Sequence, residues 1–364
     1  MRRGHFDAIR PVCPVCRSSD AAASASPLVI ASVEQEADDQ VLEGILHCSN
    51  ASCLHEFPII DGVPIIVPAL RSYVTSQVHG ILQRNDLSDA LESLLGDCCG
   101  PSSAYDQARQ VLSTYGWSHY ADLDPAEVPQ ADRSGRVGSL PLVVKSACSL
   151  LQGLPSGPWI DVGCSVGRGT FMLANQTDDL VLGVDLNFSM LRIAAEALRS
   201  GRVCYPKRRG GLVYDRREFP VSFPGAERAD FWACDALSLP VPRETFVAAT
   251  CLNLIDCVAM PRELLVSLAR ILRMGARAVL TSPYDWSPGA APPETWLGGH
   301  SQRASTGGSS EAVLRSLLTA GRHPAAVEEL ALTAEIDDLP WEVRLYDRST
   351  VSYHLHMVGV TRRA

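Results

Sequence analysis

The sequence is poor in positive charge. Of its 364 residues, 32 are Lys or Arg and 41 are Asp or Glu, which gives a formal net charge of −9, and only Lys145 and Lys207 are lysines. Proteins that bind nucleic acid usually carry a basic face, because neutralising phosphates supplies most of their affinity. The charge balance argues against a DNA-binding protein and favours a small or peptide-like substrate. A short basic run, Lys207-Arg208-Arg209, is typical of a solvated loop.

Long apolar runs and a leader segment are also missing. No stretch reaches the ~18 apolar residues that a membrane helix needs, and no apolar segment of a secretory signal follows Arg2 and Arg3. We therefore expect a cytoplasmic protein with no membrane partner. In a reducing compartment the 12 cysteines should not form disulfides. They are expected to bind a metal or to pack as small core residues.

The pattern along the chain predicts three regions. Residues 1–70 form a short β-rich unit, residues 71–140 are helical and irregular, and residues 141–364 alternate apolar strands with amphipathic helices. Such alternation is typical of a parallel sheet with helices on both faces, an α/β fold. The predicted strands are 159–163, 180–185, 230–234, 246–252, 276–281, 341–345 and 353–360. Helices are expected at 189–200 and 261–272, a hairpin over the site at 201–228, and a loop at 287–310.

A glycine-rich turn follows the first strand of the third region. The segment Trp159-Ile-Asp-Val-Gly163-Cys-Ser-Val-Gly167 runs from an apolar strand into a predicted helix. Glycines in such a turn let the backbone approach a ligand closely and adopt positive φ. Asp161 places a carboxylate beside the turn, a position that carries no acid in the usual dinucleotide fingerprint. A carboxylate there suits a ligand with a cationic amino group, such as S-adenosylmethionine.

Two more acids end the next predicted strands. Asp185 can accept both hydroxyls of a ribose, and Asp235 can accept the amino group of an adenine. Because open α/β sheets bind ligands at the carboxyl edge, Asp161, Asp185 and Asp235 are predicted to line one crevice. The alternatives are a nicotinamide nucleotide site and a Rossmann-like fold without a ligand.

These residues resemble class I methyltransferases. Asp161, Gly163, Ser165 and Gly167 fall on that family's first motif and Asp185 on its second, although Ser165 stands where glycine is common. The resemblance implies a Rossmann-like seven-stranded sheet with an antiparallel last strand, to which the two C-terminal strands would belong. It also implies a cofactor site for S-adenosylmethionine made by Asp161, Gly163, Cys164, Ser165, Gly167, Asp185, Leu186, Asp235, Ala236 and Asn253.

The segment after the fourth strand, Asn253-Leu-Ile-Asp256-Cys, faces the transferring methyl group in class I enzymes. It contains no Asn-Pro-Pro-Tyr type sequence, which argues against methylation of the adenine amino group. Cys251 stands where an RNA cytosine-C5 enzyme could place a nucleophile, but its apolar neighbours are typical of an inert core cysteine.

Four cysteines near the N-terminus have the spacing of zinc ligands. Cys13-Pro-Val-Cys16 and Cys48-Ser-Asn-Ala-Ser-Cys53 can form two knuckles whose thiolates close a tetrahedral zinc site, with His55 as a reserve ligand. The alternative is a ribbon that folds without metal. The segment that begins at His55 resembles the small zinc-ribbon activator proteins that partner methyltransferases of the translation apparatus. This resemblance implies a structural or partner-binding role for a zinc-ribbon-like domain, and it keeps an RNA or translation-factor substrate open.

Residues 155–364 also resemble the methyltransferase domain of ovothiol biosynthesis, which methylates an imidazole nitrogen of a thiol-bearing histidine. The likeness lies in Asp161–Arg168, Thr281–Trp286, Glu294–Gly299, Leu339–Arg344, Arg348, His356 and Arg362. It implies a small nitrogen nucleophile, with Tyr284, Asp285, Trp286 and His356 near the acceptor. Asp256 or His356 could act as the base. Alternatively, Tyr284 and Trp286 pack a loop, and His356 is a hydrogen-bonded core residue.

The sequence thus predicts a methyltransferase that transfers a methyl group to an imidazole or amine nitrogen of a small molecule. Its rivals are an RNA or protein methyltransferase that grips its target with the ribbon, and a non-catalytic regulator that binds S-adenosylmethionine. A basic face beside the pocket would favour the first rival, and a blocked pocket the second. An enclosed cavity of small-molecule size would favour the main prediction.

Overall fold

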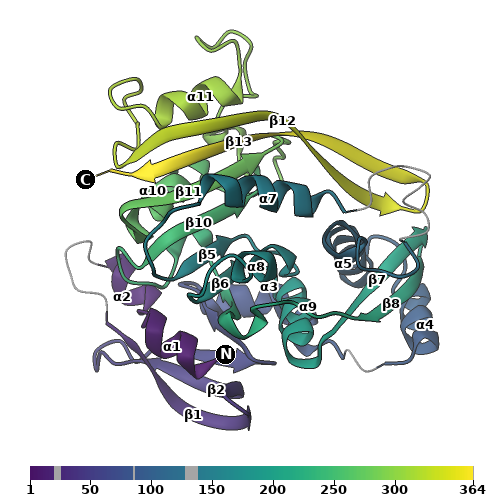
Figure 1. Cartoon of the computed structure of the whole chain (residues 1–364). Coiled ribbons are helices and arrows are strands. Elements are labelled where there is room, and N and C mark those ends of the chain that lie inside the picture. Colours follow the sequence, from purple (N-terminus) through teal and green to yellow (C-terminus); the bar gives the residue numbers. More distant parts are fainter. Residues whose placement is uncertain (20–25, 85–86, 128–137, 364) are drawn as a thin grey trace.

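One large sheet runs through the whole molecule. The computed structural model describes residues 1–19, 26–84, 87–127 and 138–363, and within them eleven strands form one sheet in the order β1-β2-β3-β4-β9-β6-β5-β10-β11-β13-β12 (Figure 1). These strands are β1 (Leu28–Ala37), β2 (Gln40–Cys48), β3 (Glu56–Ile60), β4 (Val63–Ile66), β5 (Trp159–Val162), β6 (Val181–Asp185), β9 (Ala229–Cys234), β10 (Phe246–Leu252), β11 (Leu272–Ser282), β12 (Leu330–Tyr346) and β13 (Ser349–Arg362).

The middle of this sheet confirms the predicted α/β fold. Strands β9, β6, β5, β10 and β11 are parallel neighbours, and β13 inserts antiparallel between β11 and β12. Strands β5 and β9 are buried along their whole length, as expected where helices cover both faces of a sheet. These seven strands form the Rossmann-like sheet with an antiparallel strand that the resemblance implies.

Helices cover the two faces and build two apolar cores. One core contains residues of α1 (Arg3–Ile9), α10 (Pro261–Ile271) and α11 (Ser310–Leu317). The other contains residues of α5 (Ala104–Tyr120), α7 (Leu140–Leu150), α8 (Arg168–Ala174) and α9 (Phe188–Ser200). Among the described residues, the remaining helices of four residues or more are α2 (Pro14–Ser19), α3 (Leu70–Leu82) and α4 (Asp89–Cys99). No helix in the described residues is both long enough and apolar enough to span a membrane.

The N-terminal β-unit continues the central sheet. Its last strand, β4, pairs parallel with β9 through Ile65–Ala233 and Ile66–Cys234. In Figure 1 strands β1 and β2 accordingly lie at one edge of the molecule and the yellow hairpin β12–β13 at the other. The boundaries at residues 70 and 140 remain predictions, and residues 85–86 and 128–137 of the predicted helical region lie outside the described residues.

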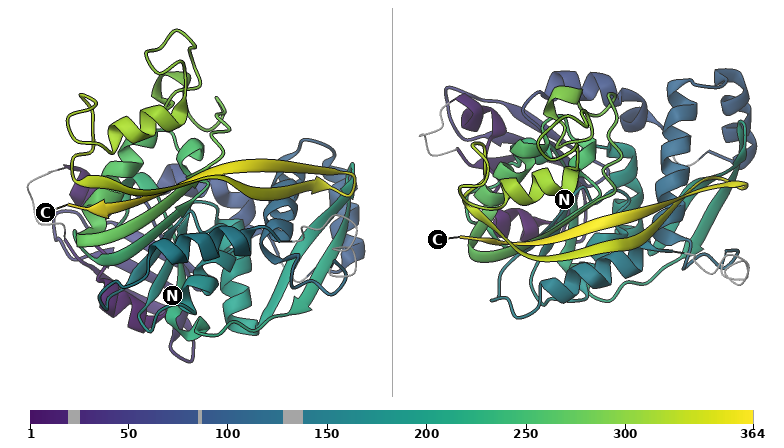
Figure 2. Two further views of the ribbon diagram at one scale, coloured as in Figure 1. Left: turned by 45° about the horizontal axis from the view of Figure 1, so that its top comes forward. Right: turned by 90° about the horizontal axis from the view of Figure 1, so that it is seen from above.

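The insertion at 201–228 forms the predicted hairpin, but elsewhere than expected. Strands β7 (Arg202–Gly210) and β8 (Val213–Pro220) pair antiparallel and pack on α5 and α9, so they do not cover the cavity at the carboxyl edge. The basic run predicted as a loop lies in β7, where Lys207 pairs with the buried Glu127. The β12–β13 hairpin extends beyond the predicted strands toward this insertion (Figure 2). At its tip the Asp347 N–H donates to the Arg209 carbonyl at 3.4 Å.

Candidate cofactor site

A cavity of about 600 Å³ opens at the carboxyl ends of β5, β6, β9 and β10. Asp161, Asp185 and Asp235 all line it, as the sequence predicts for strand-end acids of one parallel sheet. Six of the other residues predicted to hold the cofactor also line the cavity: Gly163, Cys164, Ser165, Leu186, Ala236 and Asn253. Gly167 is the one residue of this predicted set that does not line it.

The glycine turn is tied to the neighbouring strand. The N–H groups of Gly163 and Cys164 both donate to the Val184 carbonyl, at 2.8 and 3.0 Å, and the Ser165 N–H donates to Asp185 Oδ2 at 2.9 Å. Gly163, Ser165 and Gly167 have φ of 80°, 54° and 88°. Ser165 therefore occupies a left-handed position that favours glycine, which explains why glycine is common there in the family.

Gly167 has a packing role instead of a lining one. A Cβ at this position would lie 2.5 Å from the Ala194 Cβ and 2.9 Å from the Phe231 ring. The missing side chain lets the start of α8 approach α9 and β9, so Gly167 shapes the turn without contacting the cavity.

Asp161 is a buried carboxylate without a cationic partner. Its side chain accepts hydrogen bonds from Thr170 Oγ1 at 2.8 Å and Thr250 Oγ1 at 2.7 Å, and no Lys, Arg or His of the described chain pairs with it. Burial raises its pKa to about 6, while the two hydroxyl donors act in the opposite direction. A ligand with a cationic amino group would supply the missing charge.

The other two acids are held at their strand ends by backbone donors. Asp185 accepts from the N–H groups of Ser165 and Asn187, at 2.9 and 2.8 Å, and burial raises its pKa. Asp235 accepts from the Leu237 N–H at 2.9 Å, which caps the short turn Ala236–Ser238. Both carboxylates keep lone pairs for a ligand.

The predicted catalytic residues Asp256, Tyr284 and His356 do not line the cavity. Tyr284 Oη lies 2.7 Å from His356 Nδ1, and His356 Nε2 lies 2.9 Å from Glu335 Oε1. Since a carboxylate only accepts, Nε2 donates to Glu335, and in the neutral imidazole Nδ1 accepts from Tyr284. Both ring nitrogens of His356 are therefore occupied, as expected for the alternative of a hydrogen-bonded core histidine.

Asp256 lies in the turn Ile255–Cys257, whose last residue does line the cavity. Its Oδ2 accepts from the Asp285 N–H at 2.9 Å, and burial raises its pKa. Cys251 is fully buried in the core, where burial holds its thiol pKa far above the usual value. The described structure therefore offers no thiolate nucleophile at the end of β10.

Sequence reasoning missed a wall of the cavity that α5 and α7 help to build. Tyr115 and His119 of α5, Leu140 of α7 and Trp341 of β12 line it. His119 is 7% exposed, its Nδ1 has no hydrogen-bond partner among the described residues, and burial lowers its pKa to about 3. It is therefore a neutral imidazole at pH 7. The aromatic run Tyr115-Gly-Trp-Ser-His119 was the available signal.

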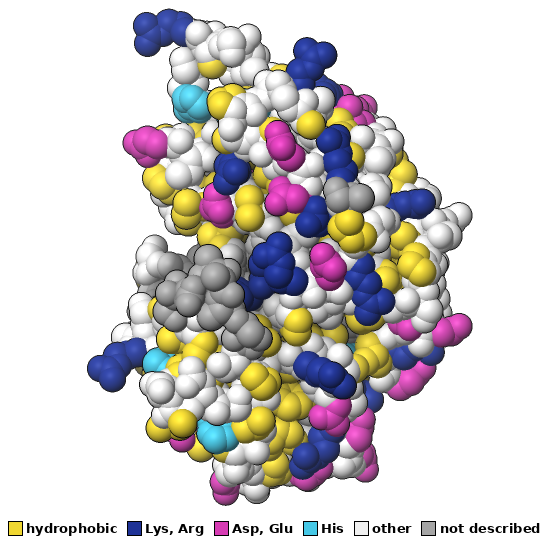
Figure 3. Space-filling model, turned by 90° about the vertical axis from the view of Figure 1, so that its left-hand side faces the viewer, with side chains coloured by type: hydrophobic (Ala, Val, Ile, Leu, Met, Phe, Trp, Pro, Cys, Tyr) yellow, Lys and Arg dark blue, Asp and Glu magenta, His cyan; other side chains and the backbone are white. Residues whose placement is uncertain are grey.

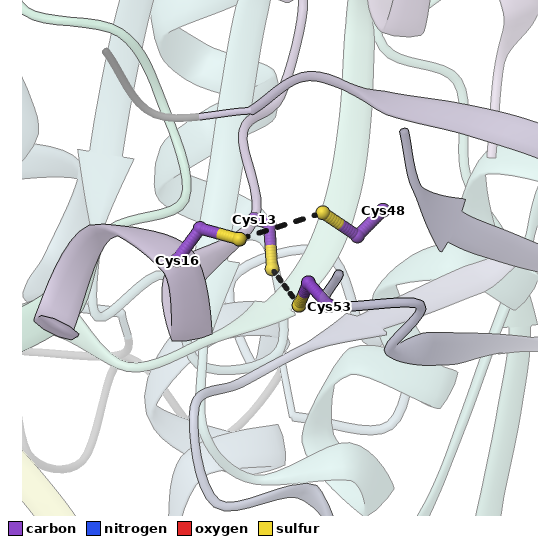
Figure 4. A group of neighbouring side chains, drawn as sticks. All are labelled: Cys13, Cys16, Cys48 and Cys53. Carbon is purple, nitrogen blue, oxygen red and sulfur yellow. Dashed lines mark hydrogen bonds between the residues drawn. The ribbon is translucent and has the colours of Figure 1, made fainter. Parts of the chain in front are cut away.

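The four N-terminal cysteines converge, as their spacing predicts. Figure 4 shows the sulfur atoms of Cys13, Cys16, Cys48 and Cys53 pointing toward one another, and all four lie within 4.8 Å of each other. The Cys13–Cys53 and Cys16–Cys48 sulfur distances are 3.8 and 3.6 Å. A tetrahedral site with zinc–sulfur bonds of ~2.3 Å needs edges of ~3.8 Å, so the donor set fits zinc.

The comparison with family models finds one match, in the central part of the chain. Residues 160–280, about a third of the chain, match the family model described as a methyltransferase domain. The matched residues include the glycine turn and the acids at the ends of β5, β6 and β9.

Some solved structures are similar to parts of this chain. Phosphoethanolamine N-methyltransferase 2 of Haemonchus contortus, in complex with S-adenosylmethionine, is 19% identical, and the match covers 39% of this chain and 28% of that chain with a TM-score of 0.31. A Streptomyces coelicolor geranyl diphosphate C-methyltransferase is 16% identical over 61% and 76%, with a TM-score of 0.38. A Methanosarcina mazei S-adenosylmethionine-dependent methyltransferase is 19% identical over 57% and 92%, with a TM-score of 0.36.

The chain thus spans less than a third of the length of the Haemonchus N-methyltransferase. These TM-scores are low, and the likenesses carry no argument about activity or substrate. No protein with a curated description matches the sequence.

Proposed function

We propose that this protein transfers the methyl group of S-adenosylmethionine to an imidazole or amine nitrogen of a small molecule. The observation that carries the proposal is the convergence of three strand-end carboxylates and a glycine turn on one cavity of small-molecule size, inside a methyltransferase domain. The same cavity argues against a non-catalytic regulator with a blocked pocket.

The residues of the cavity fit the cofactor group by group. Asp161 would hold the α-amino group, because it is a buried carboxylate that lacks a cation. Asp185 would accept the ribose hydroxyls and Asp235 the adenine amino group. When bound, the cofactor supplies an activated sulfonium methyl group, so the protein needs mainly to orient two substrates and to exclude water.

The wall made by Tyr115, His119, Leu140 and Trp341 is the proposed acceptor end of the cavity. It combines aromatic and apolar surface with a single imidazole, and a small nitrogen compound would fit there. His119 lines this wall as a neutral imidazole, so it can contact and orient an uncharged acceptor. Its lowered pKa makes it a weak proton acceptor. Asp256, Tyr284 and His356 remain the predicted catalytic contributors.

The same proposal assigns zinc to the four-cysteine cluster in a structural role. Its residues lie outside the lining of the cavity. Thiolates bind zinc where they stay reduced, which agrees with the expected cytoplasmic location.

The decisive experiment is transfer of tritiated methyl from S-adenosylmethionine into fractionated cell extract. We expect label in a small-molecule fraction, and label confined to RNA or protein would replace this proposal by its rival. On the face that Figure 3 shows, basic and acidic side chains are interspersed instead of separated into a basic patch.

Cofactor binding is tested separately by calorimetry. Asp185→Ala should weaken S-adenosylmethionine binding roughly ten- to hundredfold, because hydrogen bonds to a charged group are lost. Asp178→Ala, at an exposed position outside the cavity, is the matched control. Equal affinities of the two variants would contradict the ribose assignment.

A further inference from the structure

A second cavity, of about 490 Å³, lies on the other side of α9 from the cofactor site. Its walls come from α5, α9, the β7–β8 hairpin and the ends of α3 and α4. On α9, Ser189, Arg192 and Ile193 line this second cavity, whereas Met190 lines the first. The two cavities are therefore separate sites that share one helix.

We propose that this second cavity binds a small organic anion and that the Arg109 guanidinium is its anchor. Arg109 is 6% exposed and lines the cavity. Its guanidinium carbon lies 4.0 Å from the Tyr214 ring centroid and 5.3 Å from that of Tyr105. These rings fix the orientation of the group.

Arg109 has no acceptor for its hydrogen bonds. It makes no hydrogen bond or ion pair with any residue that the structure describes, and stacking on rings uses none of its N–H donors. In the same lining, Arg109 influences the charge of Glu92 without forming an ion pair with it. A carboxylate or phosphate group would satisfy the guanidinium with charge-assisted, bidentate hydrogen bonds.

Other arginines of the cavity are already paired. Arg192 donates to Asp61 and to three backbone carbonyls, and Arg202 pairs with Glu218 at 2.9 Å. Arg216 donates to the Leu87 carbonyl and lies 3.7 Å from Glu92. Arg192, Arg202 and Arg216 therefore help to build the wall. Unlike these three, Arg109 keeps its N–H donors available for a ligand.

The net charge of the lining favours an anion, and its apolar side chains favour a ligand that also has an apolar part. Five arginines and three glutamates line the cavity, in a protein with a net charge of −9. Apolar surface lies beside the charged groups, from Tyr105, Leu112, Ile193, Tyr205 and Pro206. The preferred ligand therefore combines one oxyanion group with an apolar or aromatic body.

Calorimetry with simple probes tests this site. We titrate the protein, saturated with S-adenosylmethionine to fill the first cavity, with phenyl phosphate, benzoate and neutral benzyl alcohol. We expect one molecule of at least one anion to bind per chain, and benzyl alcohol to bind far more weakly. The two anions distinguish a phosphate from a carboxylate ligand. Absence of binding by both, or equal binding of benzyl alcohol, would overturn the proposal.

Variants locate the binding. Arg109→Gln should weaken binding of the preferred anion roughly ten- to hundredfold, whereas Arg303→Gln, in an exposed loop far from this lining, should leave it unchanged. Equal affinity of Arg109→Gln and wild type would contradict the anchor role. If Arg109→Gln does not fold, hydrogen exchange of the wild type decides: the anion must protect amides of α5 and β7, and protection elsewhere only would refute the site.

Discussion

At the scale of single residues, Asp161 links the chemistry of the site to pH. Its pKa is raised to about 6 by burial, so below that value the carboxyl is protonated and cannot pair with a cationic amino group. We expect S-adenosylmethionine affinity to fall as pH drops from about 7 to 5, and the fall to disappear in Asp161→Asn, whose affinity should be low throughout. Calorimetry across this pH range measures both.

The raised pKa of Asp161 also determines how the free energy of unfolding changes with pH. The folded protein binds this proton more tightly than the unfolded chain does, so the group makes folding less favourable as pH rises from about 4 to 6. Asp161→Asn should therefore have a flatter stability profile than the wild type in that window, measured by urea unfolding without cofactor. A profile unchanged by the substitution would show that another group dominates there.

His119 is the residue whose removal tests the acceptor end. His119→Ala should lower turnover roughly ten- to hundredfold, because an acceptor that has lost a wall contact is positioned less well, while S-adenosylmethionine affinity stays near that of the wild type. Initial rates of methyl transfer and calorimetry separate the two effects. His79→Ala, at an exposed position of α3, provides the control. Wild-type turnover in His119→Ala would remove it from the mechanism.

At the scale of elements, the turn after β5 depends on Gly167 for two reasons that can be separated. Gly167→Ala adds both a strained positive φ and a Cβ only 2.5 Å from Ala194, whereas Gly275→Ala adds a similar φ, 76°, in open space. We expect Gly275→Ala to cost about 1 kcal/mol and Gly167→Ala about 1–3 kcal/mol more. Urea unfolding of both variants gives the difference, and equal losses would show that crowding at α8 is unimportant.

The parallel strands and their end residues were predictable, because their signals are local. Apolar runs mark strands that are covered on both faces, and the acid at each strand tip follows directly in the sequence, as Asp185 follows Val181–Val184. The two final strands were predicted too short. The first half of β12 carries exposed polar residues such as Asp337 and Asp338, which hide a strand from an apolar criterion.

The cavity wall formed by Tyr115 and His119 could not be predicted in the same way. Tyr115 and His119 lie on α5, some forty residues before β5, and only the packing of α5 against the sheet brings them to the cavity. The β7–β8 hairpin shows the same limit: its existence follows from the sequence, but its place beside α5 depends on contacts such as the Lys207–Glu127 pair. Long-range packing decided both outcomes.

At the scale of the whole molecule, the four-cysteine cluster is joined to the cofactor site. Arg17, on the helix that carries Cys16, donates to the Leu239 carbonyl and to Ser238 Oγ at 2.8 Å, and the Val12 N–H donates to the Pro240 carbonyl at 2.9 Å. These contacts hold the segment that follows Asp235. The four-cysteine cluster therefore supports the end of the cavity that we propose for the adenine.

We expect the purified protein to contain about one zinc per chain. Elemental analysis measures it, and the double variant Cys13→Ser/Cys16→Ser should lose the metal, while Cys98→Ser/Cys99→Ser, at exposed positions outside the cluster, should retain it. Because of the contacts of Arg17, the first variant should also bind S-adenosylmethionine more weakly. If the purified wild-type protein contains no metal, the zinc prediction is wrong, and the ribbon folds by its apolar core alone.

The pairing of β4 with β9 has a consequence for the order of events during synthesis. Ile65 and Ile66 leave the ribosome long before Ala233 and Cys234 are made. Until then, the edge of β4 that pairs with β9 stays unpaired. Closing a contact so distant in sequence is slow, and an open edge invites association with other chains. We therefore expect the pairing of β4 with β9 to be a late step of folding.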